Sequence, residues 1–273
     1  MKTKNRLLLT SAMMLALVAV SGTTATYAWW VSGLSVNATV STVTANADAS
    51  LQVTLANVAN TTVTGTEVKA NGKLTDVTSA DGAVFKKASL DATGSIAALT
   101  SVSVAEGVQY AGTVYYGISY SATIKMSEAI TGDLKYNVYL GDKEKVLIVE
   151  SSDSDYAARM AVSNGTSTFI VGNSAGKYQS ALPTGTPGNE GYSDGTATVS
   201  NYTNLANTTI EEVTKATAVG TYGTNFCLGT LASATQPLTI TFTMWFEGAV
   251  TKDNVVEADT FSANLYFYAI RVA

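Results

Sequence analysis

Alternation of apolar and polar residues is the feature that most restricts the fold of this chain. A period of two recurs in the segments 34–41, 51–55, 113–126, 134–140 and 238–246. This period places alternate side chains on opposite faces of a β-strand, whereas an amphipathic helix needs a period of 3.6 residues. The sequence therefore predicts an all-β protein whose strands present one apolar face to a core.

The alternation also indicates where individual strands lie. In the first segment the apolar face consists of Leu34, Val36, Ala38 and Val40. Residues 113–126 are interpreted as one long strand or as a strand with a bulge near Gly117. Residues 134–140 and 146–149 flank the turn-like GDKEK and predict a β-hairpin.

Helical signals are rare, and one long segment looks like a loop. A brief helix is expected around 154–162, where Ser154 is placed to cap it. Residues 172–207 are rich in Gly, Ser, Thr and Asn and contain Pro183 and Pro187, so we expect a long surface insertion there. Many short strands and long polar connections favour an antiparallel, jelly-roll-like β-sandwich formed as a single domain by 44–273.

The first 28 residues have the three parts of a secretory signal peptide. Basic residues precede an apolar run over 7–20, and small residues then lead up to Ala28. The run has 14 residues, fewer than the roughly 18 to 20 that cross a bilayer. We therefore expect cleavage between Ala28 and Trp29 and secretion of a chain that begins with two tryptophans.

Composition excludes several function classes. The chain has 16 basic and 21 acidic residues, so nucleic acid is not an expected partner. Histidine is absent, which removes the usual Ser-His-Asp and Cys-His nucleophile systems and the HExxH zinc site. The lone cysteine, Cys227, forms no intrachain disulfide and is interpreted as a buried small hydrophobic residue. We expect no catalytic residue, cofactor or metal, and thus no enzyme.

Two groups of acidic residues are candidate sites. Asp153 and Asp155 in SSDSDY have oxygen atoms that suit calcium, but so common a spacing favours a solvated turn. Glu211 and Glu212 beside Lys215 are better explained as an exposed charged segment than as a catalytic pair.

The segment MWFEG, residues 244–248, combines an aromatic residue, a carboxylate and a glycine at the end of a predicted strand. We expect Trp245 to pack on a neighbouring sheet and Glu247 to accept hydrogen bonds from nearby backbone amides. Gly248 is expected to adopt a positive φ.

Four motifs follow one another along the chain: TYAWW after the leader, NADASLQV, SYSATIKMSEAITGDLKYNVYL and ITFTMWFEG. Their order resembles that in the TasA/camelysin-like secreted proteins. The resemblance implies a Gram-positive-type bacterium, cleavage by a SipW-type signal peptidase and jelly-roll subunits of biofilm matrix fibres. It also implies an extracellular matrix or cell-surface location, with other matrix or cell-wall components as further partners.

The match to this family is incomplete. The family often has an aspartate soon after the glycine of the turn, where this chain reads GAVTKD. Camelysin is described as a metalloprotease, but a chain without histidine lacks the usual zinc site, so protease activity is not transferred.

The apolar start of the expected mature chain suggests a mode of assembly. Residues 29–43 can act as a donor strand that completes the sheet of a neighbouring copy, with Leu34, Val36, Ala38 and Val40 entering its core. A head-to-tail contact of this kind builds a homopolymeric fibre. In the alternative, the same strand folds into its own sandwich and the protein is a monomeric surface adhesin or binding domain. The alternation is the same in both cases.

Overall fold

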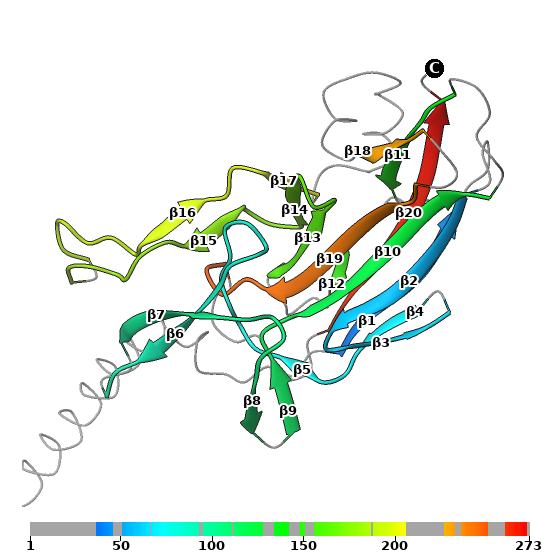
Figure 1. The fold of residues 1–273 in the computed structure, drawn as a ribbon. Helices are drawn as coiled ribbons and strands as arrows, with labels where there is room; N and C mark the ends of the chain where they lie inside the picture. The colour runs from blue at the N-terminus through cyan, green and yellow to red at the C-terminus, as the bar shows by residue number, and fades with distance from the viewer. Residues whose placement is uncertain are drawn as a thin grey trace, which may run out of the picture.

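The computed structural model describes residues 37–45, 51–65, 67–92, 95–110, 112–127, 134–141, 148–150, 156–186, 188–205, 227–232, 236–250 and 260–271. These residues form β-strands, turns and bends, and no helix occurs among them. The prediction of an all-β protein is therefore confirmed (Figure 1).

Two large sheets make up most of the fold. The first sheet has the order β18(Cys227–Leu231), β11(Tyr136–Gly141), β20(Thr260–Arg271), β1(Asn37–Ala45), β4(Glu67–Ala70) and β3(Thr61–Thr64), and β12(Ile148–Glu150) also pairs with β20. The second sheet has the order β17(Tyr202–Asn204), β14(Thr168–Gly172), β13(Ala158–Ser163), β19(Leu238–Phe246), β10(Ile118–Met126) and β2(Leu51–Ala59).

Three smaller sheets lie outside these two. They are the hairpin of β6(Phe85–Leu90) with β7(Ile96–Val102), the pair β15(Lys177–Gln179) with β16(Thr196–Thr198), and the sheet of β5(Lys73–Leu74), β9(Gly112–Tyr115) and β8(Gly107–Tyr110).

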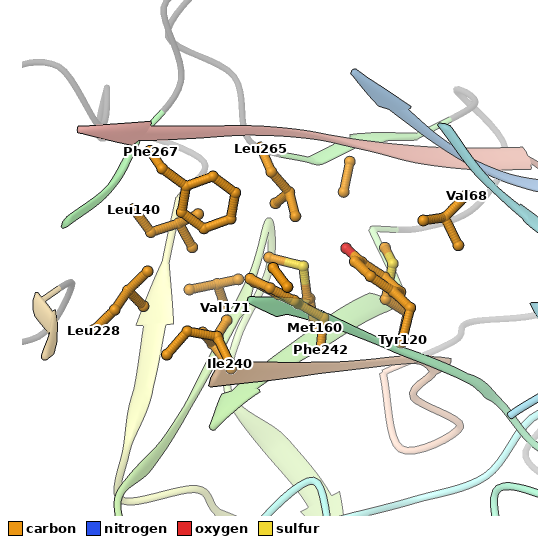
Figure 2. Packing of buried hydrophobic residues seen from close by; sticks show 14 of the residues in the cluster. Val68, Tyr120, Leu140, Met160, Val171, Leu228, Ile240, Phe242, Leu265 and Phe267 are labelled. Carbon is orange, nitrogen blue, oxygen red and sulfur yellow. The ribbon is translucent and has the colours of Figure 1, made fainter. Parts of the chain in front are cut away.

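The main core lies between the two large sheets. Figure 2 shows Leu265 and Phe267 of β20 facing Ile240 and Phe242 of β19 across this space. Phe242 stacks on Tyr120 with a centroid distance of 5.1 Å and meets Phe267 edge-on at 6.1 Å. Because each sheet buries one face against the other, alternate residues of β10 and β19 are apolar, as the sequence predicted.

A second buried cluster covers the opposite face of the second sheet. Its members are Val77, Phe85, Tyr116, Ala161, Ile170, Val199 and Trp245. They come from β13, β14 and β19 and from the segments that cross the outside of that sheet. The second sheet is therefore buried on both faces near Trp245.

The chain changes sheets at Gly117. The expected long strand over 113–126 is two strands, because β9 pairs with β5 and β8 whereas β10 pairs with β2 and β19. A Cβ atom at Gly117 would lie 2.9 Å from the carbonyl oxygen of Met244. Glycine therefore allows the close backbone approach at this break.

Two other expectations were wrong. Residues 158–162, expected within a helix around 154–162, belong to β13 at the centre of the second sheet. The expected hairpin over 134–149 does not form among the described residues, since β11 and β12 both pair antiparallel with β20 along its length.

The segment 172–207, expected as a long surface insertion, is not all loop. Its described residues contain the short strands β15, β16 and β17 and bury Gln179 and Val199.

Candidate functional site

The predicted donor strand is represented by β1, which begins at Asn37. Ala38 and Val40 belong to this strand, whereas Ala28, Trp29, Leu34 and Val36 lie outside the described residues. β1 pairs in parallel with β20 and antiparallel with β4 (Figure 1). The register places Val40 beside Ala263 on one side and Val68 on the other, and both of these partners are fully buried.

The position of β1 makes it the link between the two parts of the first sheet. β20 already carries β11 and β12 on its other edge, and β4 carries β3. Without β1, the inner edges of β20 and β4 would lose their pairing partner and the sheet would divide. We call the space between these two strands the β1 slot.

The Trp245 to Gly248 turn follows β19 and surrounds a buried carboxylate. Oε2 of Glu247 accepts hydrogen bonds from the Ser79 amide at 3.2 Å and from Nε1 of Trp245 at 3.1 Å. Oε1 accepts one from the Ala249 amide at 3.1 Å. The prediction that Glu247 binds backbone amides is therefore confirmed, and the partners show that it fastens the loop before β6 to the end of β19.

Trp245 is fully buried and meets Phe85 edge-on at 5.3 Å. Its packing on the β6–β7 hairpin confirms the expected contact with a neighbouring sheet. The prediction for Gly248 was wrong, because this residue is not among the glycines with positive φ. Its amide instead donates to the carbonyl oxygen of Val77 at 3.0 Å, which continues the pairing of the chain at 77 with the end of β19.

A second carboxylate, Asp76, lies close to Glu247 and was missed from the sequence. Asp76 is 4% exposed, and neither of its carboxylate oxygens has a hydrogen-bond partner among the described residues. Burial, followed by the negative charge of Glu247, raises the pKa of Asp76 well above its usual range. Burial also raises the pKa of Glu247 to about 6, an effect limited by its hydrogen bonds and by the charge of Arg159.

Arg159 supplies the buried positive charge of this region. It lies opposite Trp245 in the pairing of β13 with β19 and is 1% exposed. Its guanidinium donates to the carbonyl oxygens of Tyr156, Ala158 and Ala175 and to Oγ of Ser174, at 2.7 to 3.0 Å, and lies 5.2 Å from the ring centroid of Tyr202. The four bonds use its planar donors to hold 156–158 and 174–175 together. Its role is structural.

An open groove of about 670 Å³ crosses the outer face of the second sheet. Its floor consists of small residues of the sheet, including Ser119, Thr241 and Thr243. Val58 lies at one side, at the end of β2, and Val84 lies in the loop before β6. These two valines are 55% and 53% exposed, so apolar surface at the groove faces solvent.

Of the remaining candidate residues, the structure describes only Cys227. Cys227 is half-buried in β18, and burial raises the pKa of its thiol, which favours the protonated form. Asp153, Asp155, Glu211, Glu212 and Lys215 lie outside the described residues. Within the described ranges, no three His, Cys, Asp or Glu side chains are grouped so as to hold a metal ion.

The part of the chain with described structure contains no helix that is long and apolar enough to cross a membrane. Comparisons with protein-family models, curated proteins and solved structures gave no match in any of the three.

Proposed function

We propose that this protein is a secreted structural subunit that assembles head to tail into an extracellular fibre by donating its N-terminal strand. The observation that supports the proposal is the β1 slot, which requires a strand between β20 and β4 to complete the first sheet. The likeness of four sequence motifs to TasA/camelysin-like proteins, with their jelly-roll subunits, forms part of the proposal.

The slot accepts a strand from another copy as well as its own. A second copy has the same sequence, so it offers the same backbone groups and the same alternation, and exchange of an identical element keeps every contact. Seven residues of β1 are in register with β20. At about 1 kcal/mol per main-chain hydrogen bond, with the burial of apolar side chains in addition, the exchanged strand makes a durable contact.

Cleavage of the leader determines when assembly can begin. Before cleavage after Ala28, the strand is joined to the leader and is not free to enter a neighbouring copy. After cleavage it becomes a terminal segment, and a contact that does not close on itself extends into a filament. The partners in this proposal are further copies, the signal peptidase and other matrix or cell-wall components. No catalytic activity, cofactor or nucleic acid is involved.

A second candidate function is a monomeric adhesin or binding domain on the cell surface. The observation that favours it is that β1 has both of its neighbours, β20 and β4, within one chain. In this case the N-terminal strand is an ordinary part of the fold, and assembly plays no role.

Deletion of residues 29–43 from the mature protein separates these candidates. The fibre proposal expects the truncated protein to stay monomeric, while the intact mature protein forms filaments visible by negative-stain microscopy. Filaments at normal yield from the truncated protein would exclude this strand as the linker. If the intact protein is monomeric at every concentration, the adhesin is favoured.

A pair of substitutions in β1 tests which of its residues face the core of the subunit that accepts the strand. Val40→Asp places a charge at the register position between buried Val68 and Ala263, where an unpaired carboxylate costs several kcal/mol. Thr39→Asp places the same charge one residue away, opposite Lys69. We expect Val40→Asp to abolish filaments and Thr39→Asp to preserve them. Equal effects would contradict the assignment of faces.

A further inference from the structure

The open groove on the second sheet has a chemical character that restricts its occupant. No charged side chain among the described residues lines it, although the chain as a whole carries 37 charged residues. The groove combines hydroxyl groups such as those of Ser119 and Thr243 with apolar surface from Val58, Val84 and Val104. The part of an occupant that lies in the groove must therefore be uncharged and largely apolar, because a charged group would lose its hydration without gaining a partner.

The groove begins close to the place where β1 enters its slot. Thr39 pairs with Lys69 and Val40 with Val68 in antiparallel register. Continued by two residues, this register sets Asn37 opposite Asn71. The backbone amide of Asn71 donates to the carbonyl oxygen of Asn60 at 2.8 Å, so the start of β1 lies about two strand spacings, or about 10 Å, from Asn60. Asn37, Asn71 and Asn60 thus form a row. Ala59, the residue before Asn60, lines the groove.

Asn60 ties this row directly to the wall of the groove. Its Nδ2 donates to the carbonyl oxygens of Val104 at 2.6 Å and of Gly117 at 2.9 Å. Val104 is itself a lining residue. A chain that leaves the start of β1 thus has a short route, around a corner fixed by hydrogen bonds, to the groove.

The segment that precedes β1 has the composition that the groove requires. Residues 29–36, WWVSGLSV, contain no charged side chain and include two tryptophans. After cleavage the segment's single charge is the α-amino group of Trp29, at its free end, where it need not enter the groove. Eight extended residues span about 26 Å, more than enough to reach the groove and run along it. Each indole has about 200 Å² of surface to bury, and burial of such surface drives association.

We propose that the groove is the docking site for residues 29–36 of the neighbouring subunit, whose following residues fill the β1 slot. This inference rests on the proposed strand exchange and extends it. Each junction then has two parts, a strand in the first sheet and a tryptophan-containing segment on the outer face of the second sheet. In this arrangement the two tryptophans after the expected cleavage site bury their indole rings in the groove.

Disulfide trapping between two populations tests the contact. Both populations carry Cys227→Ser; one also carries Ser32→Cys and the other Val84→Cys, at the exposed edge of the groove. After assembly of the mixture and mild oxidation, we expect linked dimers containing one chain of each kind. Leu182→Cys is the matched control, since Leu182 is exposed but does not line the groove, and we expect no linkage from it.

A charge substitution provides a second measurement that does not depend on oxidation. Val84→Glu places a carboxylate at the groove on an exposed residue, so folding should be unaffected. We expect the protein concentration needed for assembly to rise about tenfold or more, which corresponds to about 1.4 kcal/mol of lost contact energy. Leu182→Glu should leave this concentration unchanged.

The outcomes distinguish the groove from the strand exchange. Normal filaments without linkage at Val84→Cys, and with Val84→Glu assembling normally, would overturn the groove inference and leave strand exchange standing. Linkage within single monomeric chains of a Ser32→Cys, Val84→Cys double variant would show that a chain fills its own groove, which also overturns the inference. Absence of filaments from the intact protein would overturn both proposals.

Discussion

Replacement of Glu247 by glutamine should change how stability depends on pH. Glu247 is fully buried, and its pKa in the folded protein is about 6, compared with an ordinary value of 4.5. The folded state therefore holds the Glu247 proton over a pH range in which the unfolded chain has released it. Stability from this group is complete below about pH 4.5 and is lost as the pH rises through 6. Glutamine carries no such proton.

The size of the effect follows from the two pKa values. The difference between 4.5 and about 6 corresponds to about 2 kcal/mol of unfolding free energy. In Glu247→Gln an NH₂ group replaces one of the two carboxylate oxygens. Either the Ala249 amide, which donates to Oε1, or the donors to Oε2 then lose their acceptor, which costs about 1–3 kcal/mol at every pH. We expect the variant to be less stable than the wild type at pH 4.5, and this deficit to shrink by about 2 kcal/mol by pH 7.5.

Urea denaturation followed by circular dichroism across this pH range measures the difference. Glu190→Gln is the matched control, because Glu190 is exposed, and its curve should run parallel to that of the wild type. If the curves of Glu247→Gln and wild type run parallel as well, Glu247 does not hold its proton in the folded state and the reasoning is refuted.

Three further substitutions test other buried features. Burial and the charge of Glu247 raise the pKa of Asp76, so the unfolding free energy of the wild type should fall as the pH rises above about 4, and Asp76→Asn should remove this fall. Denaturation at pH 5 and pH 8 measures the difference, and an unchanged pH dependence would contradict the prediction. Tyr120→Phe should increase the unfolding free energy by about 1 kcal/mol, since the buried hydroxyl has no hydrogen-bond partner among the described residues; a thermal melt that shows a loss of stability would contradict that reading. Gly82→Ala should cost about 1–3 kcal/mol in a urea melt, because Gly82 has φ +69° and an added Cβ would overlap that of Ala161; a neutral result would mean that the loop adjusts freely.

The sequence predicted the strands that have one buried and one less buried face. β10 and β19 alternate in the sequence because only one face of each meets the main core. β13 was mistaken for part of a helix because its residues are buried on both faces, so its apolar residues form a run without a period of two. The run alone cannot distinguish a buried strand from a buried helix.

Pairing between distant segments was the other source of error. A charged turn between two apolar segments predicts a hairpin, but β11 and β12 each pair with β20, more than a hundred residues later in the chain. Local sequence does not encode that choice, which depends on the edge that the last strand offers. The burial of Arg159 and Asp76 was missed for a similar reason, although a lone arginine within an apolar run was a visible signal at Arg159.

The parallel pairing of the first described strand with the last determines how the fold responds to force. β1 and β20 run in the same direction, with Asn37 beside Thr260 and Ala45 beside Phe267. Tension applied at the start of β1 and at the end of β20 pulls the two strands past each other along their length. Their hydrogen bonds then resist together instead of opening one after another from an end. A sheet joined in this way resists tension along these two strands better than tension across them.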